Sequence, residues 1–219
     1  MKTKAVIGAG VAIAAIILLM FAFTIPWYNY SAENVEQGEE TVDIERDFHL
    51  DEAEVKQDSQ STTYDYQEED LDALDSTFGT TEMFVMIAVI GTILGLIGAI
   101  LVAFGILNPK IGSYLAVVGI IFAFVAPLYL WVYLPGAFEE DMEWGEVGPH
   151  QGPLYFAGGG SVGQEERTWG PAIGWFLLLV AGILNVVVFR LTGACRASPS
   201  SEPVEEEEYQ PMEEDEYIE

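Results

Sequence analysis

The chain has 219 residues, of which 35 are acidic and 8 are basic, so its formal net charge is −27. Hydrophobic residues nevertheless make up 51% of it, which suits a soluble domain poorly but suits a membrane protein in which apolar and charged residues form separate blocks. Because nucleic-acid phosphates are bound by Lys and Arg, the charge argues against nucleic acid as a partner. The single cysteine, Cys195, excludes an intrachain disulfide.

Four apolar segments are long enough to cross a bilayer as helices, which takes about 20 residues. The first could also be a signal peptide, but its apolar stretch is longer than usual and no A-x-A cleavage site follows it, so we expect an uncleaved span. If it is cleaved, three spans remain and the predicted sides of all other segments are unchanged. The four segments run from Ala5 to Trp27, Met83 to Leu107, Ile111 to Leu134 and Pro171 to Leu191.

The basic residues near the span ends predict the orientation, because Lys and Arg concentrate on the cytoplasmic side. If the chain alternates regularly, five of the eight fall on one side, so we expect a multi-pass protein of the cell membrane with both termini cytoplasmic. These five are Lys2, Lys4, Lys110, Arg190 and Arg196. Aromatic residues that should mark the outer membrane interface are Trp27, Tyr28, Tyr30, Trp131, Tyr133 and Trp169.

All acidic residues lie outside the predicted spans. The first outer segment holds 18 acids and two bases, the second holds 7 acids and one base, and the tail holds 10 acids. The tail lacks apolar periodicity and is expected to be disordered. A heavy acid load on every exposed segment is tolerable where salt screens it, which favours a salt-rich exterior and an archaeal source.

The predicted parts are 1–27, a first transmembrane helix; 28–82, an acidic outer segment; 83–134, a transmembrane hairpin; 135–170, a second outer loop; 171–191, a fourth transmembrane helix; and 192–219, the cytoplasmic tail.

The first outer segment contains a strand pattern. From Val42 to Leu50 apolar residues alternate with polar ones, with Arg46 among the apolar positions, which predicts a strand with one dry face. Short strands are also expected in "TTYDYQ" and "PLYFAG", whereas "EEDLDALDSTF" indicates a short helix before the second span. We interpret the Gly-rich "AGGGSVGQEERTWGP" as a flexible connector. The predicted fold is therefore an all-α membrane protein, a bundle of four transmembrane helices with a small, partly β, acidic extracytoplasmic cap.

Small residues recur on two of the predicted spans. Gly91 and Gly95 form a G-x-x-x-G pattern that Gly98 extends, and Gly8 and Ala12 have the same spacing on the first span. Such stripes let two helix backbones approach closely. The second span therefore packs either against another span of this chain, for which the first is a candidate, or against a second copy in a homo-oligomer.

The sequence predicts no catalytic, cofactor or metal site. Asp43, Glu45, Asp47 and Asp51 share one predicted strand face, but no calcium-loop pattern is present and a solvated acidic face is the simpler interpretation. His49 and His150 lack a zinc-binding spacing.

The polar residues inside the spans are few. Pro127 should bend the third span, and the main polar groups at depth are Thr92 and Asn185. Without ionisable groups there, ion-coupled transport is disfavoured. Cys195, just past the fourth span, is a plain thiol or an acylation site.

The order of spans and loops resembles the layout of claudins, and Pro26-Trp27 at the end of the first span resembles a claudin feature. Tetraspanins share the four spans with the loop sizes reversed. The claudin Gly-Leu-Trp motif and outer cysteine pair are missing, as is the tetraspanin Cys-Cys-Gly. The resemblance therefore concerns topology alone and transfers no site.

These observations predict a non-enzymatic integral membrane protein that organises, adheres to or assists protein partners. Its expected surroundings are the lipid bilayer, protein partners or further copies of itself, with no cofactor and no nucleic acid. The alternatives are a small channel or transporter and an extracytoplasmic protein that binds divalent cations.

Overall fold

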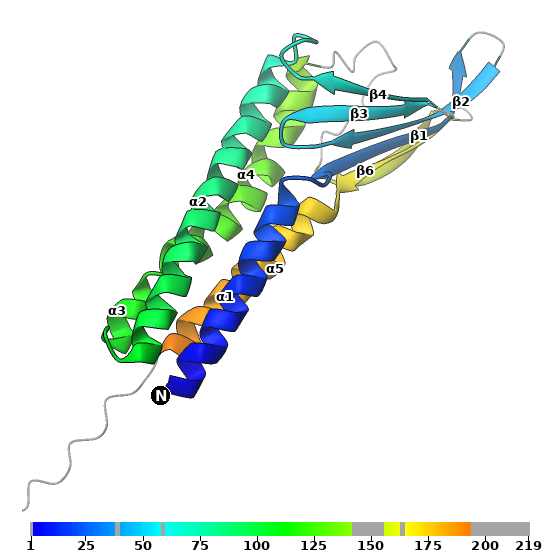
Figure 1. Ribbon diagram of the computed structural model, residues 1–219. Helices are drawn as coiled ribbons and strands as arrows, with labels where there is room; N and C mark the ends of the chain where they lie inside the picture. Colours follow the sequence, from blue (N-terminus) through cyan, green and yellow to red (C-terminus); the bar gives the residue numbers. More distant parts are fainter. Residues whose placement is uncertain (1, 38–39, 58–59, 142–155, 163–164, 194–219) are drawn as a thin grey trace, which may run out of the picture.

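The structure is a computed structural model of the chain and describes residues 2–37, 40–57, 60–141, 156–162 and 165–193. Its helices form an elongated bundle, and an antiparallel sheet projects sideways from one end of that bundle (Figure 1). The helices are α1 (Lys2–Ala22), α2 (Asp72–Phe104), α3 (Pro109–Tyr114), α4 (Val117–Asp141) and α5 (Ile173–Thr192). The strands are β1 (Tyr28–Gln37), β2 (Glu40–Phe48), β3 (Glu52–Gln57), β4 (Gln60–Asp65), β5 (Gly158–Val162) and β6 (Glu165–Pro171).

The prediction of an all-α fold is wrong. Six strands form a single sheet in the order β4-β3-β2-β1-β6-β5, so the protein is mixed α/β. The segment between the first two apolar blocks supplies β1 to β4 as a meander, and β6, from the segment between the last two blocks, pairs with the other edge of β1. The sheet was underestimated because the five strands other than β2 carry few apolar residues or lack a strict alternation.

Four helical segments are long and apolar enough to cross a membrane, which agrees with the four apolar blocks in the sequence. The second is longer than its apolar block, because the acidic turn at Asp72 and the span that follows form one continuous helix. The start of α1, the short α3 and the end of α5 meet at one end of the bundle, the hairpin end (Figure 1). The sheet lies at the opposite end, the sheet end.

A cluster of aromatic rings joins the sheet to the bundle. Phe48 of β2 stacks on Phe78 of α2 at 6.2 Å between ring centroids and meets Phe138 of α4 edge-on at 5.0 Å. Tyr66 also stacks on Phe78, at 5.4 Å, and all four rings are buried. Burial of large rings in such offset and edge-to-face pairs is strongly stabilising, so the sheet is fixed to the helices by a continuous core.

Trp27 connects α1, the sheet and α5. Its backbone N–H donates to Phe48 O at 2.8 Å, its carbonyl accepts from Ala172 N at 3.0 Å, and its indole Nε1 donates to Ala22 O at 2.6 Å. Of the aromatic residues expected to mark the outer interface, Trp27, Tyr28 and Tyr30 are buried in the core, whereas Trp131 and Tyr133 are exposed. A tryptophan that satisfies its indole internally needs no contact with a membrane surface.

The Gly-rich stretch predicted to be a flexible connector is instead part of the sheet. Gly158 to Val162 form β5, which pairs with β6 in the register Gly158↔Trp169 to Val162↔Glu165. Glycine is favoured at Gly158 because a Cβ there would lie 2.9 Å from the Trp169 ring. The first half of the predicted strand "PLYFAG" falls outside the described residues, and of its second half only Gly158 belongs to β5.

Candidate functional site

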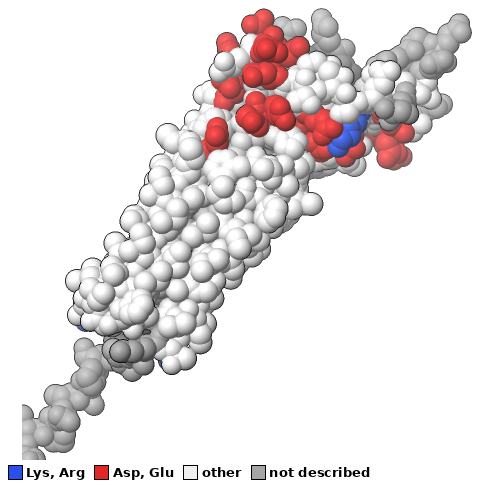
Figure 2. Space-filling view, in the orientation of Figure 1, with Lys and Arg blue, Asp and Glu red and all other residues white. Residues whose placement is uncertain are grey.

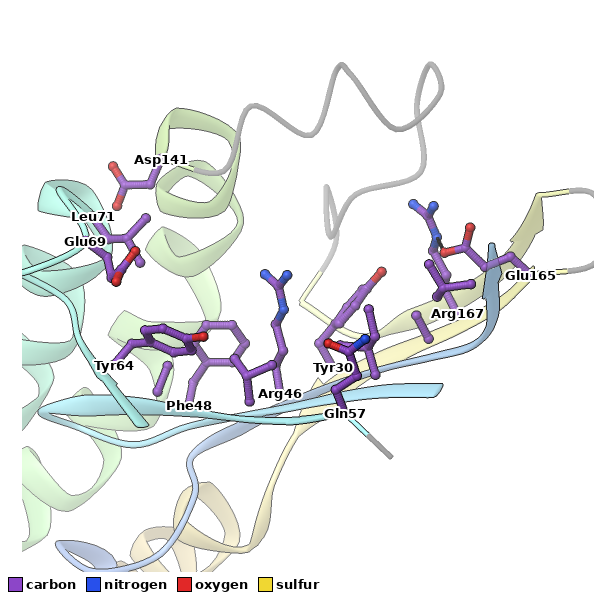
Figure 3. Close-up of a pocket in the computed structure, with 15 residues that line it drawn as sticks. Tyr30, Arg46, Phe48, Gln57, Tyr64, Glu69, Leu71, Asp141, Glu165 and Arg167 are labelled. Atoms are coloured by element: carbon purple, nitrogen blue, oxygen red, sulfur yellow. Dashed lines mark hydrogen bonds and ion pairs between the residues drawn. The ribbon is translucent and has the colours of Figure 1, made fainter. Parts of the chain in front are cut away.

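A hollow of about 580 Å³ lies over one face of the sheet, beside the ends of α2 and α4 (Figure 3). We call it the trough. Side chains from five strands and both helix ends surround it, and most of its floor is apolar. Its lining residues are Tyr30, Ala32, Val35, Ile44, Arg46, Phe48, Ala53, Val55, Gln57, Tyr64, Glu69, Leu71, Asp141, Glu165 and Arg167.

Strand register places the residues of the trough floor. Arg167, Ala32, Ile44 and Gln57 are partners in one row across β6, β1, β2 and β3. Successive residues of a strand point to opposite faces, so members of such a row share a face. The small side chain of Ala32 between longer neighbours leaves a depression in this row. The face of β2 that was predicted to be apolar therefore forms part of the floor of the trough, through Ile44, Arg46 and Phe48.

Two arginines project from this face. Arg167 is only 2% exposed, and its Nε donates to Glu165 Oε1 at 2.6 Å. This hydrogen bond is the largest cause of the raised pKa of Arg167, whereas burial acts in the opposite direction and lowers that pKa. Arg46 is half-buried, and Figure 3 shows the guanidinium ends of both arginines on the same side of the sheet.

Tyr30 lies within electrostatic reach of both arginines. Burial raises the pKa of its hydroxyl, Arg167 lowers it, Glu165 raises it and Arg46 lowers it, in that order of size. Charges influence a hydroxyl in this way only at short range in a poorly solvated site. Tyr30, Arg46, Arg167 and Glu165 therefore form one electrostatic group in the trough.

The opposite end of the trough is acidic. Glu69 and Asp141 lie there, on the turn before α2 and at the end of α4 (Figure 3). Asp141 accepts from the backbone N–H groups of Ala73 at 3.1 Å and Leu74 at 2.6 Å. Its charge therefore stabilises the first turn of α2, whose own N-cap residue, Leu71, has no side chain that could accept a hydrogen bond.

The other face of the sheet carries the predicted acidic stripe. Asp47 is 7% exposed, accepts from Asn29 Nδ2 at 2.7 Å and pairs with Lys56 Nζ at 2.5 Å. The hydrogen bond to Asp47 is the largest cause of the raised pKa of Lys56. Figure 2 shows acidic side chains gathered at the sheet end, while the middle of the bundle visible in this view is uncharged.

These carboxylates form no preformed cation site. Within the described residues, no group of three or more His, Cys, Asp and Glu side chains is arranged to hold a metal ion. Asp47 is committed to Lys56 and Asn29 instead. His49 lies in the turn after β2, where its backbone N–H donates to Glu52 O, whereas His150 falls outside the described residues, as do Cys195 and the tail.

The glycine stripe of α2 faces the α3–α4 segment. A Cβ on Gly91 would lie 2.7 Å from Gly119 Cα, a Cβ on Gly95 would lie 3.0 Å from Ala116 Cβ, and a Cβ on Gly98 would collide with the Gly112 carbonyl. Gly8 and Ala12 of α1 have other neighbours. A Cβ on Gly8 would lie 3.5 Å from Thr192 Oγ1 of α5, and Ala12 is buried beside Ala116 and Val188.

The polar residues inside the bundle bind each other. Asn185 Nδ2 donates to Thr92 Oγ1 at 2.9 Å, and that hydroxyl donates to Ala88 O at 2.7 Å. At Pro127 the chain stays helical, and the Pro127 carbonyl accepts from Trp175 Nε1 of α5 at 2.9 Å. These bonds join α2 and α4 to α5 without any ionisable group.

Sequence reasoning missed the trough, because its residues come from strands that could not be placed side by side without the register. A partial signal existed. Arg46 interrupts the apolar face of its strand, and Arg167 is the single base of the second outer segment. No protein-family model matches the chain, and no curated protein matches it either.

Proposed function

We propose that this protein is a non-enzymatic, multi-pass membrane protein that binds other proteins through its sheet. The observation that carries the proposal is the sheet itself. Both outer segments contribute to it, it is fixed to the bundle by a buried aromatic core, and it projects beyond the footprint of the helices (Figure 1). Such a rigid, laterally displayed surface suits contacts with a neighbouring protein.

The distribution of basic residues supports an outward-facing sheet. Lys4, Lys110 and Arg190 belong to the elements that meet at the hairpin end, and the acidic side chains gather at the sheet end (Figure 2). Under the positive-inside rule the hairpin end faces the cytoplasm, and the sheet faces the exterior.

The edges of the sheet support protein contacts. Among the described strands, β4 and β5 are the outermost, so each has an edge with backbone groups able to pair with another strand. Protective edges carry Lys, Pro or inward-pointing charges. β5 contains no charged residue and no proline, and β4 contains a single charged residue, Asp65, at its end. An added strand from a partner would bind by main-chain hydrogen bonds.

The packing of the bundle weighs against the alternative of a small channel. Where Gly91 faces Gly119, the backbones of α2 and α4 approach so closely that a single methyl group would not fit. A water-filled path between these two helices would require them to separate there. The alternative of a cation-binding protein has no preformed site among the described residues.

The orientation is testable by cysteine labelling in intact cells. In a Cys195→Ser background, a membrane-impermeant maleimide should label Thr63→Cys on β4 and should leave Lys110→Cys unlabelled until the cells are opened. Both positions are exposed, so access alone does not separate them. If intact cells label Lys110→Cys and not Thr63→Cys, the hairpin end faces the exterior and the proposed orientation is wrong.

Partner contacts are testable by photocrosslinking in native membranes. A photoreactive residue at Thr62 of β4 or Ser161 of β5 should give discrete adducts, and one at Gln67, exposed just beyond β4, should not. A second, differently tagged copy in the same cells distinguishes self-association from another partner. Recovery of the protein as a lone monomer without edge-specific adducts would refute the proposed function.

A further inference from the structure

We propose that the trough binds a small organic anion, a molecule that carries a carboxylate or phosphate group on an apolar body. This goes beyond the proposed contacts with other proteins and does not depend on them. Those contacts use the strand edges, whereas the anion would lie on the face of the sheet beside α2 and α4 (Figure 3).

The first argument is the placement of positive charge. The two outer segments hold 25 acidic residues and three basic ones, Arg46, Lys56 and Arg167. Two of the three line the same hollow, in spite of a chain that is strongly negative overall. Lys56 is on the opposite face, where Asp47 holds it. The lining also includes three carboxylates. Glu69 and Asp141 lie at the opposite end of the trough, and Glu165 binds the Nε of Arg167, so an anion would be bound at the end where the two guanidinium groups lie.

The second argument is the geometry of Arg167. Its side chain is almost entirely buried, and Glu165 holds the Nε, which fixes the direction of the guanidinium plane. The terminal nitrogens point away from the sheet, toward the same side as those of Arg46 (Figure 3). A guanidinium oriented in this way presents paired donors that match the two oxygens of a carboxylate or phosphate.

The third argument is the floor of the trough. Ala32, Ile44 and Val55 lie next to the arginines, and Phe48 lies toward α2 and α4. A few polar groups over an apolar lining are typical of sites for small organic molecules, and a volume of about 580 Å³ falls within their usual range. The apolar floor favours an organic anion over inorganic phosphate. The carboxylates of Glu69 and Asp141 disfavour a second negative group at the far end.

The test uses the full chain in nanodiscs of neutral lipid and titrates it with benzoate and phenyl phosphate by calorimetry. Benzyl alcohol and benzyltrimethylammonium are the uncharged and cationic controls. We expect saturable binding of benzoate, phenyl phosphate or both, weakened by added salt, and no saturable binding of the controls. Nanodiscs that contain an anionic lipid identify the source of the ligand. If that lipid competes with the probes, a lipid headgroup is the source; if it does not, a soluble anion is.

Variants locate the binding. Arg167→Gln and Arg46→Gln should each weaken it by about tenfold or more, since a hydrogen bond to a charged group contributes roughly 1.5–3 kcal/mol. Lys56→Gln is the matched control, because it removes the same charge from the other face and should leave binding unchanged. Ile44→Trp fills the floor without altering any charge and should also weaken binding, which keeps the test valid if Arg167→Gln does not fold.

Three results would overturn the inference. They are the absence of saturable binding by both anionic probes, equal binding of the uncharged or cationic probe, and an effect of Lys56→Gln as large as that of the arginine variants. Each of them would leave the strand-edge crosslinks of the proposed function unaffected, so the two proposals fail separately.

Discussion

A single carboxylate links the ends of two long helices. The first N–H groups of an α-helix have no partner within the helix, and α2 begins after Leu71, a residue that cannot cap them. Asp141, at the end of α4, accepts from Ala73 N and Leu74 N in place of a local cap. Because it also lines the trough, Asp141 connects the beginning of α2 to the proposed site.

Replacing Asp141 should loosen the start of α2. Asp141→Ala removes both acceptors and should destabilise this helix end by about 1–2 kcal/mol, the usual effect of losing a cap. Hydrogen exchange at the amides of Ala73 and Leu74 should accelerate accordingly. Glu140→Ala is the control, because Glu140 is exposed and its replacement removes the same charge one residue earlier in the chain. Equal acceleration in both variants would mean that net charge, and not the cap, is responsible.

Buried tyrosines should limit stability at alkaline pH. Tyr66 donates its hydroxyl hydrogen to the backbone oxygens of His49 and Glu52, at 2.8 and 2.9 Å, and burial raises its pKa well above the ordinary 10.0. The folded state keeps this proton where the unfolded chain loses it, so the free energy of unfolding should fall as the pH rises above 10.0.

The measurement is tyrosinate absorbance followed together with unfolding. The difference in absorbance between the original protein and Tyr66→Phe reports on Tyr66 and should appear only as the protein unfolds. Tyr66→Phe should also show a weaker dependence of stability on pH in this range, and a loss of about 1–3 kcal/mol at neutral pH from the unpaired carbonyls. Ionisation of Tyr66 in the folded protein would contradict the prediction.

At the scale of elements, α2 is defined by what faces its glycines. Gly91 meets Gly119 of α4, whereas Gly79 of the same helix has nothing within 4 Å of an added Cβ. The same residue type therefore has opposite consequences at two positions. At Gly91 it permits close approach of two backbones, and at Gly79 it only weakens the helix.

Alanine substitutions separate these two roles. Gly91→Ala should destabilise the protein by about 1–3 kcal/mol, because the new methyl group meets backbone atoms of Gly119 that cannot move aside. Gly79→Ala should stabilise it by up to about 1 kcal/mol through helix propensity. Thermal unfolding of the two purified variants in the same detergent provides the comparison. If Gly91→Ala is as stable as Gly79→Ala, α2 and α4 do not pack as closely as described.

The strands show which patterns the sequence reveals. β2 was predicted because Val42, Phe48 and the positions between them keep the period of two. β1 starts with the same period at Tyr28, Tyr30 and Ala32, but an irregularity before Val35, with Asn34 at a φ of 58°, moves the pattern by one residue. A bulge of this kind hides a strand from any search for strict alternation.

The prediction of a short strand in "TTYDYQ" is confirmed in part, since β4 ends at Asp65. β5 and β6 lack the alternation for a different reason. β5 is mostly glycine, and β6 buries an arginine where alternation would require an apolar residue. β6 depends on pairing with β1, a contact between residues more than 130 positions apart in sequence, and β5 depends in turn on pairing with β6. Long-range pairing of this kind is a tertiary effect that local propensity does not encode. The trough, built on the same pairing, could not be predicted for this reason.

At the scale of the whole molecule, charge and hydropathy are almost completely separated. The segments that connect the first to the second and the third to the fourth apolar block carry 25 acids and three bases, and their described acidic residues gather at the sheet end. Mutual repulsion among these acids opposes the compact arrangement of the sheet. The few ion pairs described there, such as Lys56 with Asp47 and Arg167 with Glu165, offset only part of it.

Salt should therefore stabilise the sheet end. The Debye length shortens from about 30 Å at 0.01 M to about 10 Å at 0.1 M and about 3 Å at 1 M, so repulsion between neighbouring exposed carboxylates weakens steadily. We expect the thermal unfolding midpoint to rise with NaCl over this range, and hydrogen exchange in β2 and β3 to slow. KCl should act equally, which separates screening from specific ion effects. If the midpoint falls with salt, attractive ion pairs such as Lys56 with Asp47 outweigh the repulsion. Repulsion among the acidic residues would then not be the main electrostatic contribution to the stability of the sheet.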